Sequence, residues 1–142
     1  MRVWAASLTA ERRGAVVNEI VLVADDVLDT RELYAMHFTS HGFRALTSID
    51  GQSTIETALA HRPDVIILDR AMPKLDGISV TRLLKSDPRT QDTPIIILTA
   101  YPHDSIESGA LEAGADIVLT KPCLPEYLEA RVRELLARTR DS

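Results

Sequence analysis

Residues 64–77 have the sequence DVIILDRAMPKLDG, in which a short apolar run ends at an acidic residue, Asp69. The run VIIL, residues 65–68, is rich in β-branched side chains, which is typical of a strand buried on both faces of a sheet. Four more runs of similar length occur, three of them continuously apolar and the last with the mixed pattern of an edge strand: residues 20–24, 95–98, 117–119 and 43–47. The chain therefore contains candidate strands suited to a parallel sheet.

Helix-like segments follow each of these runs. Most of them stop at a glycine or just before a proline, and both residues are common helix stops. We expect helices at residues 30–41, 52–61, 77–86, 104–113 and 125–138. The repeated strand–helix order predicts an α/β domain whose parallel sheet is covered by helices on both faces. The small number of repeats favours an open, doubly wound sheet over an eight-fold barrel.

Composition excludes several classes of function. The 142 residues suit one domain, and 45% of them are hydrophobic, which is ordinary for a globular protein. The net charge of −5 argues against direct nucleic-acid binding and against attraction to anionic membranes. No apolar run approaches the roughly 20 residues that cross a bilayer, and a single cysteine, Cys123, excludes an intrachain disulfide. We expect a cytoplasmic protein with a flexible extension at residues 1–18 and one domain at residues 19–142.

Polar side chains follow the predicted strands at the points where they end. Asp25 and Asp26 follow the first run, Asp69 the third, Thr99 the fourth, and Lys121 comes shortly after the fifth. The carboxyl ends of parallel strands share one edge of a sheet, where ligands bind. Each residue alone would be a turn residue, a helix cap or a surface lysine. Their joint placement argues for a site.

Three neighbouring carboxylates repel one another, and a hard divalent cation relieves that repulsion. We expect Mg²⁺, or Mn²⁺ in its place, with room left for a phosphate oxygen. Asp69 is of the residue type that forms an aspartyl phosphate. Lys121 would offset the charge of a phosphoryl group, and Thr99 would hydrogen-bond one of its oxygens.

These residues resemble the response-regulator receiver family of two-component and phosphorelay signalling, which includes chemotaxis regulators. The most specific piece is Met72-Pro73 followed by Asp76-Gly77, just beyond Asp69. The resemblance covers about residues 19–138, with matching segments at residues 20–26, 64–77, 94–100 and 114–122. It implies a flavodoxin-like (βα)5 sheet with strand order 2-1-3-4-5.

The resemblance also implies roles for individual residues. Asp69 would be the phosphoacceptor, Asp26 a direct metal ligand and Asp25 a ligand through water. The backbone carbonyl of Ala71 would complete the protein's contacts with the metal. The chain would therefore be a phosphoacceptor signalling domain and not an enzyme, apart from catalysing its own phosphorylation and dephosphorylation.

Further implications concern the switch and its partners. Thr99 would move toward the phosphoryl group that Lys121 contacts, and the Lys121-Pro122 peptide is commonly cis in the family. The phosphodonor would be a phosphohistidine on a sensor histidine kinase or a histidine phosphotransfer protein. With no output domain expected after residue 142, the signal would pass to a downstream protein from a monomer or a phosphorylation-dependent dimer. The output surface is expected at the last strand and the last two helices, with Val118, Tyr101, Tyr127 and Leu128 as candidate residues.

Three positions, Val118, Cys123 and Arg70, depart from the family pattern. Val118 stands where an aromatic switch residue is usual, and its stiff branched side chain cannot make the same rotamer swing. Tyr101 would either replace that aromatic or shield the site. Cys123 replaces a common phenylalanine and is expected to be a small buried hydrophobe, and Arg70 replaces a usual apolar residue. Val118 therefore leaves open an alternative, a degenerate receiver that acts by protein contact without phosphorylation.

Two further alternatives are weaker. A phosphatase of the haloacid-dehalogenase type, which also uses an aspartate nucleophile, needs an acid two residues after it, where this chain has Ala71. A flavin carrier with a flavodoxin-like sheet needs backbone donors and small polar residues after its first strand. Asp25 and Asp26 occupy that position and would repel the flavin phosphate.

Overall fold

The computed structural model describes residues 18–101 and 103–140, and within them strands and helices alternate strictly along the chain. The elements are β1 (Ile20–Ala24), α1 (Leu28–Ser40), β2 (Arg44–Ser48), α2 (Gly51–His61), β3 (Val65–Asp69), α3 (Gly77–Lys85), β4 (Ile95–Thr99), α4 (Asp104–Ala113), β5 (Ile117–Thr120) and α5 (Pro125–Arg140). Each predicted strand and helix is present, with ends that differ by no more than a few residues. The predicted extension at residues 1–18 lies, apart from Asn18, outside the described residues.

The strands form one parallel sheet in the order β2-β1-β3-β4-β5, which confirms the flavodoxin-like topology. Every residue of β3 and β4 is buried, whereas β2 and β5 at the two edges are partly exposed. The continuous apolar runs at residues 20–24, 65–68 and 95–98 therefore correspond to the central strands, because helices cover both of their faces, whereas the run at residues 117–119 forms the edge strand β5.

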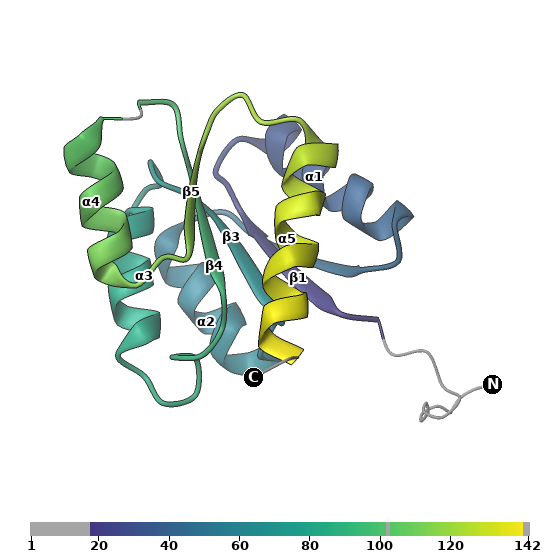
Figure 1. Cartoon of the computed structure of the whole chain (residues 1–142), viewed down its shortest axis with the longest axis horizontal. Helices are drawn as coiled ribbons and strands as arrows, with labels where there is room; N and C mark the ends of the chain where they lie inside the picture. The colour runs from purple at the N-terminus through teal and green to yellow at the C-terminus, as the bar shows by residue number, and fades with distance from the viewer. Residues whose placement is uncertain (1–17, 102, 141–142) are drawn as a thin grey trace.

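Helices cover the sheet in two layers, with α1 and α5 on one face and α2, α3 and α4 on the other (Figure 1). Successive residues of a strand point to opposite faces, so Val23 and Ile67 pack under α1 and α5 while Leu22 and Ile66 pack under the other layer. Each such aliphatic side chain, fully buried, contributes roughly 1.5–3 kcal/mol.

The prediction that Leu128 lies on the output surface was wrong. Leu128 is completely buried in the core beneath α1 and α5. It begins the apolar stripe of α5, which continues with Val132, Leu135 and Leu136, at the spacing of one helix face. A helix that covers a sheet must turn that stripe inward.

The helix ends follow the local sequence. The predicted stop of α4 at Gly114 is confirmed, since this glycine caps the helix with a left-handed φ of 116°. Asp50 and Ser53 form a reciprocal capping box at the start of α2. In the described part of the chain, no helix is both long enough and apolar enough to span a bilayer.

Candidate functional site

The carboxyl ends of β1, β3, β4 and β5 meet at one edge of the sheet. In the strand register Ala24 pairs with Leu68, Asp69 with Leu98, and Thr99 with Thr120. The residues that end or follow these strands therefore share that edge. A cleft of about 210 Å³ opens there, and its lining includes Asp26, Asp69, Arg70, Ala71, Thr99, Tyr101 and Lys121.

Three carboxylates, those of Asp25, Asp26 and Asp69, gather at this cleft beside Lys121. We call these four residues the acidic cleft. Asp25, Asp26 and Asp69 each place one oxygen within 4.8 Å of the others. Asp25 and Asp69 are buried, whereas Asp26 is exposed and keeps the group open to solvent. An all-oxygen donor set of this size, open on one side, suits a hard divalent cation that keeps several waters. The three acids predicted to share a cation are thus close enough to do so.

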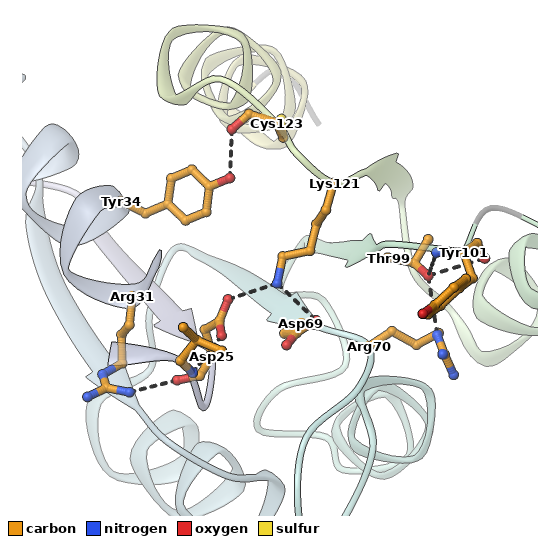
Figure 2. Close-up of polar contacts among 10 residues, drawn as sticks. Asp25, Arg31, Tyr34, Asp69, Arg70, Thr99, Tyr101, Lys121 and Cys123 are labelled. Carbon is orange, nitrogen blue, oxygen red and sulfur yellow. Dashed lines mark hydrogen bonds and ion pairs between the residues drawn. The ribbon is translucent and has the colours of Figure 1, made fainter. Parts of the chain in front are cut away.

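Lys121 lies between two of these carboxylates (Figure 2). Its Nζ is 3.2 Å from Asp25 Oδ2 and 3.4 Å from Asp69 Oδ1. Burial of the Lys121 ammonium opposes its charge, but Asp69 and Asp25 outweigh that effect, so its pKa is raised and it stays protonated. The peptide between Lys121 and Pro122 is cis, as the resemblance implied.

The surroundings of Asp69 disfavour the charged form of its carboxyl. Burial raises the pKa of the Asp69 carboxyl, the Lys121 ammonium opposes the rise, and the charge of Asp25 adds to it. The backbone N–H of Ala71 also donates to the carboxylate and works against the rise. A carboxylate that is desolvated yet not fully neutralised is suited to react with, or bind, an electrophilic partner.

Asp25 is oriented by its own loop. Its Oδ1 accepts a hydrogen bond of 2.9 Å from the Val27 N–H, which leaves Oδ2 to face Lys121. Arg31, one turn into α1, donates to the backbone carbonyl of Asp25 at 2.9 Å. The start of α1 therefore fixes the direction of this carboxylate.

The Asp76-Gly77 pair has a steric explanation. Asp76 caps α3 by accepting from the Ser79 N–H at 2.8 Å, and the Gly77 N–H donates to the Arg70 carbonyl at 2.8 Å. A Cβ on Gly77 would lie 2.7 Å from the Asp69 carbonyl oxygen, closer than real contacts allow. Only glycine lets α3 begin directly against the residue at the end of β3.

Thr99 is engaged by two neighbours that the sequence analysis did not connect to it. Its buried Oγ1 accepts from the Tyr101 N–H at 3.1 Å and from Arg70 Nε at 3.3 Å. Figure 2 shows Arg70 and Tyr101 together around Thr99, on the side of Asp69 away from Asp25. The only sequence signal for these contacts was the residue type of Arg70, an arginine directly after Asp69 where an apolar residue is usual.

The residues predicted for the output surface fall in two places. Val118 is half-buried, packs against the core under α2, α3 and α4, and shares a surface groove with Tyr127 of α5. Tyr101, 64% exposed, lines the acidic cleft instead. Cys123 is buried as expected, burial raises the pKa of its thiol, and its carbonyl accepts a 2.6 Å hydrogen bond from the Tyr34 hydroxyl.

Comparison with known proteins identifies the class of this domain. The model of the response regulator receiver domain matches residues 21–133. The chain is 36% identical over 124 residues to the phosphate regulon transcriptional regulatory protein PhoB of Pseudomonas aeruginosa, covering 87% of this chain and 54% of PhoB. Its fold resembles that of the chemotaxis response regulator CheY4 of Vibrio cholerae, with a TM-score of 0.79, 27% identity and coverage of 84% and 99% of the two chains.

A second solved structure bears on the metal. The receiver domain of a sensor histidine kinase from P. aeruginosa PAO1 has a magnesium ion coordinated in its active site cleft. It matches this chain with a TM-score of 0.79 and 26% identity, covering 85% of this chain and 99% of its own. That ion belongs to the relative, in a cleft of the same fold.

Fold and site together define a phosphoacceptor signalling module of two-component systems, not a conventional enzyme. The chain belongs to the response regulator receiver domain family, whose members partner with histidine kinases. It spans about half the length of the curated relatives it matches, 47% and 54% for the first two.

Proposed function

We propose that this chain is a phosphorylation switch in which Asp69 accepts a phosphoryl group from a phosphohistidine on a sensor histidine kinase or a histidine phosphotransfer protein. The observation that carries the proposal is the position of Asp69 at the acidic cleft. Its carboxylate is nearly buried, 3.4 Å from the Lys121 ammonium and within 4.8 Å of two other carboxylates. The arrangement offers a nucleophilic oxygen beside a fixed positive charge.

Phosphoryl transfer would proceed by in-line displacement at phosphorus. A carboxylate oxygen of Asp69 forms the new O–P bond while the N–P bond of the phosphohistidine breaks, and the departing imidazole nitrogen takes up a proton from the medium. Lys121, already shared between Asp25 and Asp69, reaches the phosphoryl oxygens and offsets their added charge. Most of the acceleration comes from positioning and charge neutralisation.

The acidic cleft also fits the cation that the family uses. Asp26 would bind Mg²⁺ or Mn²⁺ directly, Asp25 through water, and Asp69 and the Ala71 carbonyl would complete the protein's share. When bound, the cation supplies positive charge that neutralises the three carboxylates and the phosphoryl oxygens. The support for this assignment is the all-oxygen donor set and the exposure of Asp26, which leaves space for water.

Thr99 would act as the switch residue. To hydrogen-bond a phosphoryl oxygen, its hydroxyl must leave the contacts that it makes with Arg70 Nε and the Tyr101 N–H. Release of Arg70 and Tyr101 would carry the change to the surface, without an aromatic swing at Val118. The groove that Val118 and Tyr127 share would then bind the downstream protein with altered affinity.

The remaining parts of the proposal concern the whole protein. Residues 19–142 would form the receiver domain and residues 1–18 an extension outside it. The protein would work in the cytoplasm, as a monomer or a dimer that forms on phosphorylation, and signal to another protein without binding nucleic acid itself.

Phosphorylation of Asp69 can be tested with a small phosphodonor. The wild type, incubated with acetyl phosphate and Mg²⁺, should gain the mass of one phosphoryl group, and EDTA should prevent this. Asp69→Asn should gain none, whereas Asp92→Asn, which changes an exposed aspartate away from the cleft, should behave as the wild type. An unlabelled wild type, also with a phosphorylated histidine partner, would instead favour the degenerate receiver.

A further inference from the structure

A second group of candidate ligands lies between α1 and α5, apart from the residues of the acidic cleft. His37 and His41 are four residues apart and therefore share one face at the end of α1. Glu129 of α5 faces them, and one ligand atom from each of the three residues lies within 4.8 Å of the others. We call these three residues the histidine cluster. His37 is about 13 Å further along the axis of α1 than Leu28, the first residue of that helix.

The backbone fixes which nitrogen of His41 is available. Its Nδ1 lies 2.7 Å from the carbonyl oxygen of His37. A carbonyl oxygen only accepts, so Nδ1 carries a proton, and in the neutral ring Nε2, 4.0 Å from Glu129 Oε1, keeps the lone pair that a metal needs. This distance is too long for a hydrogen bond. Metal-binding histidines commonly donate a hydrogen bond to a carbonyl from the ring nitrogen that does not bind the metal, as Nδ1 does here.

Glu129 has its two oxygens divided between separate partners. Oε2 accepts from Arg133 Nε at 2.7 Å, and Oε1 lies 2.7 Å from His37 Nε2. Arg133 in turn donates to the His41 carbonyl at 3.0 Å, which ties α5 to the end of α1. The carboxylate is thus held with one oxygen facing both imidazole rings.

The spacing is close to that of a tetrahedral site. Metal–ligand bonds of about 2.0–2.2 Å place neighbouring donors roughly 3.4 Å apart. The two distances from Glu129 Oε1, 2.7 Å to His37 and 4.0 Å to His41, lie on either side of that value. The rings are stacked, with centroids 4.1 Å apart, and His41 is 47% exposed, so small rotations, with loss of the Nε2 proton that His37 donates to Glu129, would place both nitrogens at bonding distance.

We propose that His37, His41 and Glu129 form a second cation site, which binds Zn²⁺ or a similar transition metal and clamps α1 to α5. Two imidazole nitrogens and one carboxylate favour Zn²⁺, Co²⁺, Ni²⁺ or Cu²⁺ over Mg²⁺. The exposed side of His41 leaves the fourth position to water. This site is independent of the acidic cleft, whose oxygen donors take a hard cation, and of the proposed phosphorylation of Asp69.

Zinc titration of the full chain by calorimetry tests the proposal, with Mg²⁺ in excess to fill the acidic cleft. The wild type should bind one Zn²⁺, and Co²⁺ in its place should give the visible absorption of a four-coordinate site. His37→Gln and His41→Gln should each weaken binding by at least about tenfold. His61→Gln, which changes an exposed histidine at the end of α2, should not weaken it.

A stability measurement gives a second readout. Zn²⁺ should raise the thermal midpoint of the wild type and of His61→Gln, but not that of His41→Gln, whose half-exposed ring can be replaced without opening the core. Zinc affinity that survives in both histidine variants but is lost in Asp26→Asn would place the metal in the acidic cleft and overturn the proposal. Failure of the wild type to bind Zn²⁺ would overturn it too.

Discussion

The acidic cleft and the histidine cluster each bring together side chains from elements far apart in the chain. The charged groups of the cleft mainly repel one another, whereas those of the cluster attract one another. In the acidic cleft three carboxylates repel one another, and the Lys121 ammonium offsets part of that repulsion. In the histidine cluster Glu129 meets donors on both of its oxygens. A group that repels itself costs stability and is retained for what it binds, whereas a group that attracts is stable without a ligand. The contrast predicts different responses to substitution.

The largest effect is expected from removal of the Lys121 ammonium, the positively charged side chain inside the acidic cleft. Lys121→Ala leaves Asp25 and Asp69 buried without a positive partner, and should lower the free energy of unfolding by about 3 kcal/mol at pH 7. Added Mg²⁺ should restore part of the loss. Urea denaturation measures both effects. Lys74→Ala, which breaks a surface ion pair with Asp50, should change stability little, and equal losses in the two variants would contradict this account.

The next effect concerns the backbone that supports the cleft. Gly77→Ala places a Cβ 2.7 Å from the Asp69 carbonyl oxygen, so α3 must shift. We expect a loss of about 2 kcal/mol and slower labelling of Asp69 by acetyl phosphate.

Gly109→Ala in α4 is the matched control. Its nearest neighbour would be Ile78 Cδ1 at 3.9 Å, an ordinary contact, so alanine should stabilise the helix by about 0.5–1 kcal/mol. If both substitutions destabilise equally, the close approach at Gly77 is not the cause.

The third prediction tests directly whether a charge in the acidic cleft lowers stability while a charge in the histidine cluster raises it. Since burial and Asp25 raise the pKa of Asp69 in the folded state, the stability that Asp69 contributes is present below its unfolded pKa and is lost as pH rises through the folded one. Asp69→Asn should therefore be more stable than the wild type at pH 7, and the difference should shrink as pH falls toward 4. Glu129→Gln should be less stable at pH 7 by about 1–2 kcal/mol, because it weakens the interactions with His37 and Arg133. Denaturation across this pH range decides the point: two variants that shift the same way would remove the contrast.

The smallest effect concerns Tyr34, which joins α1 to the segment beside Lys121. Burial, together with the neighbouring Cys123 and Asp25, raises the pKa of Tyr34 to about 12, and its hydroxyl donates a hydrogen bond to the Cys123 carbonyl. The stability that Tyr34 contributes is therefore fully present below pH 10 and is lost as pH rises toward 12. Tyr34→Phe should cost about 1 kcal/mol at pH 7 and remove the last phenol to ionise in an absorbance titration. A wild type that shows no late phenol would count against the burial of this hydroxyl.

Much of the acidic cleft was predictable because its residues are tied to local patterns. The apolar runs identify the strands, and parallel strands bring the residues at their carboxyl ends to one edge. This places Asp25, Asp69, Thr99 and Lys121 together without any knowledge of side-chain packing. The Asp76-Gly77 pair is also visible in the sequence, but its reason, the approach of Gly77 to the Asp69 carbonyl, is a tertiary distance.

The sequence by itself determined the alternation of strands and helices, the open sheet and the edge at which the acids meet, because these depend on periodicity and on the handedness of strand–helix units. The packing of α5 on α1 was decided only in three dimensions: it brought Glu129 to His37, 92 residues away in the chain. The contact of Arg70 with Thr99 across neighbouring strands is of the same kind. Such contacts depend on how helices and loops settle on the sheet, and no local spacing encodes that.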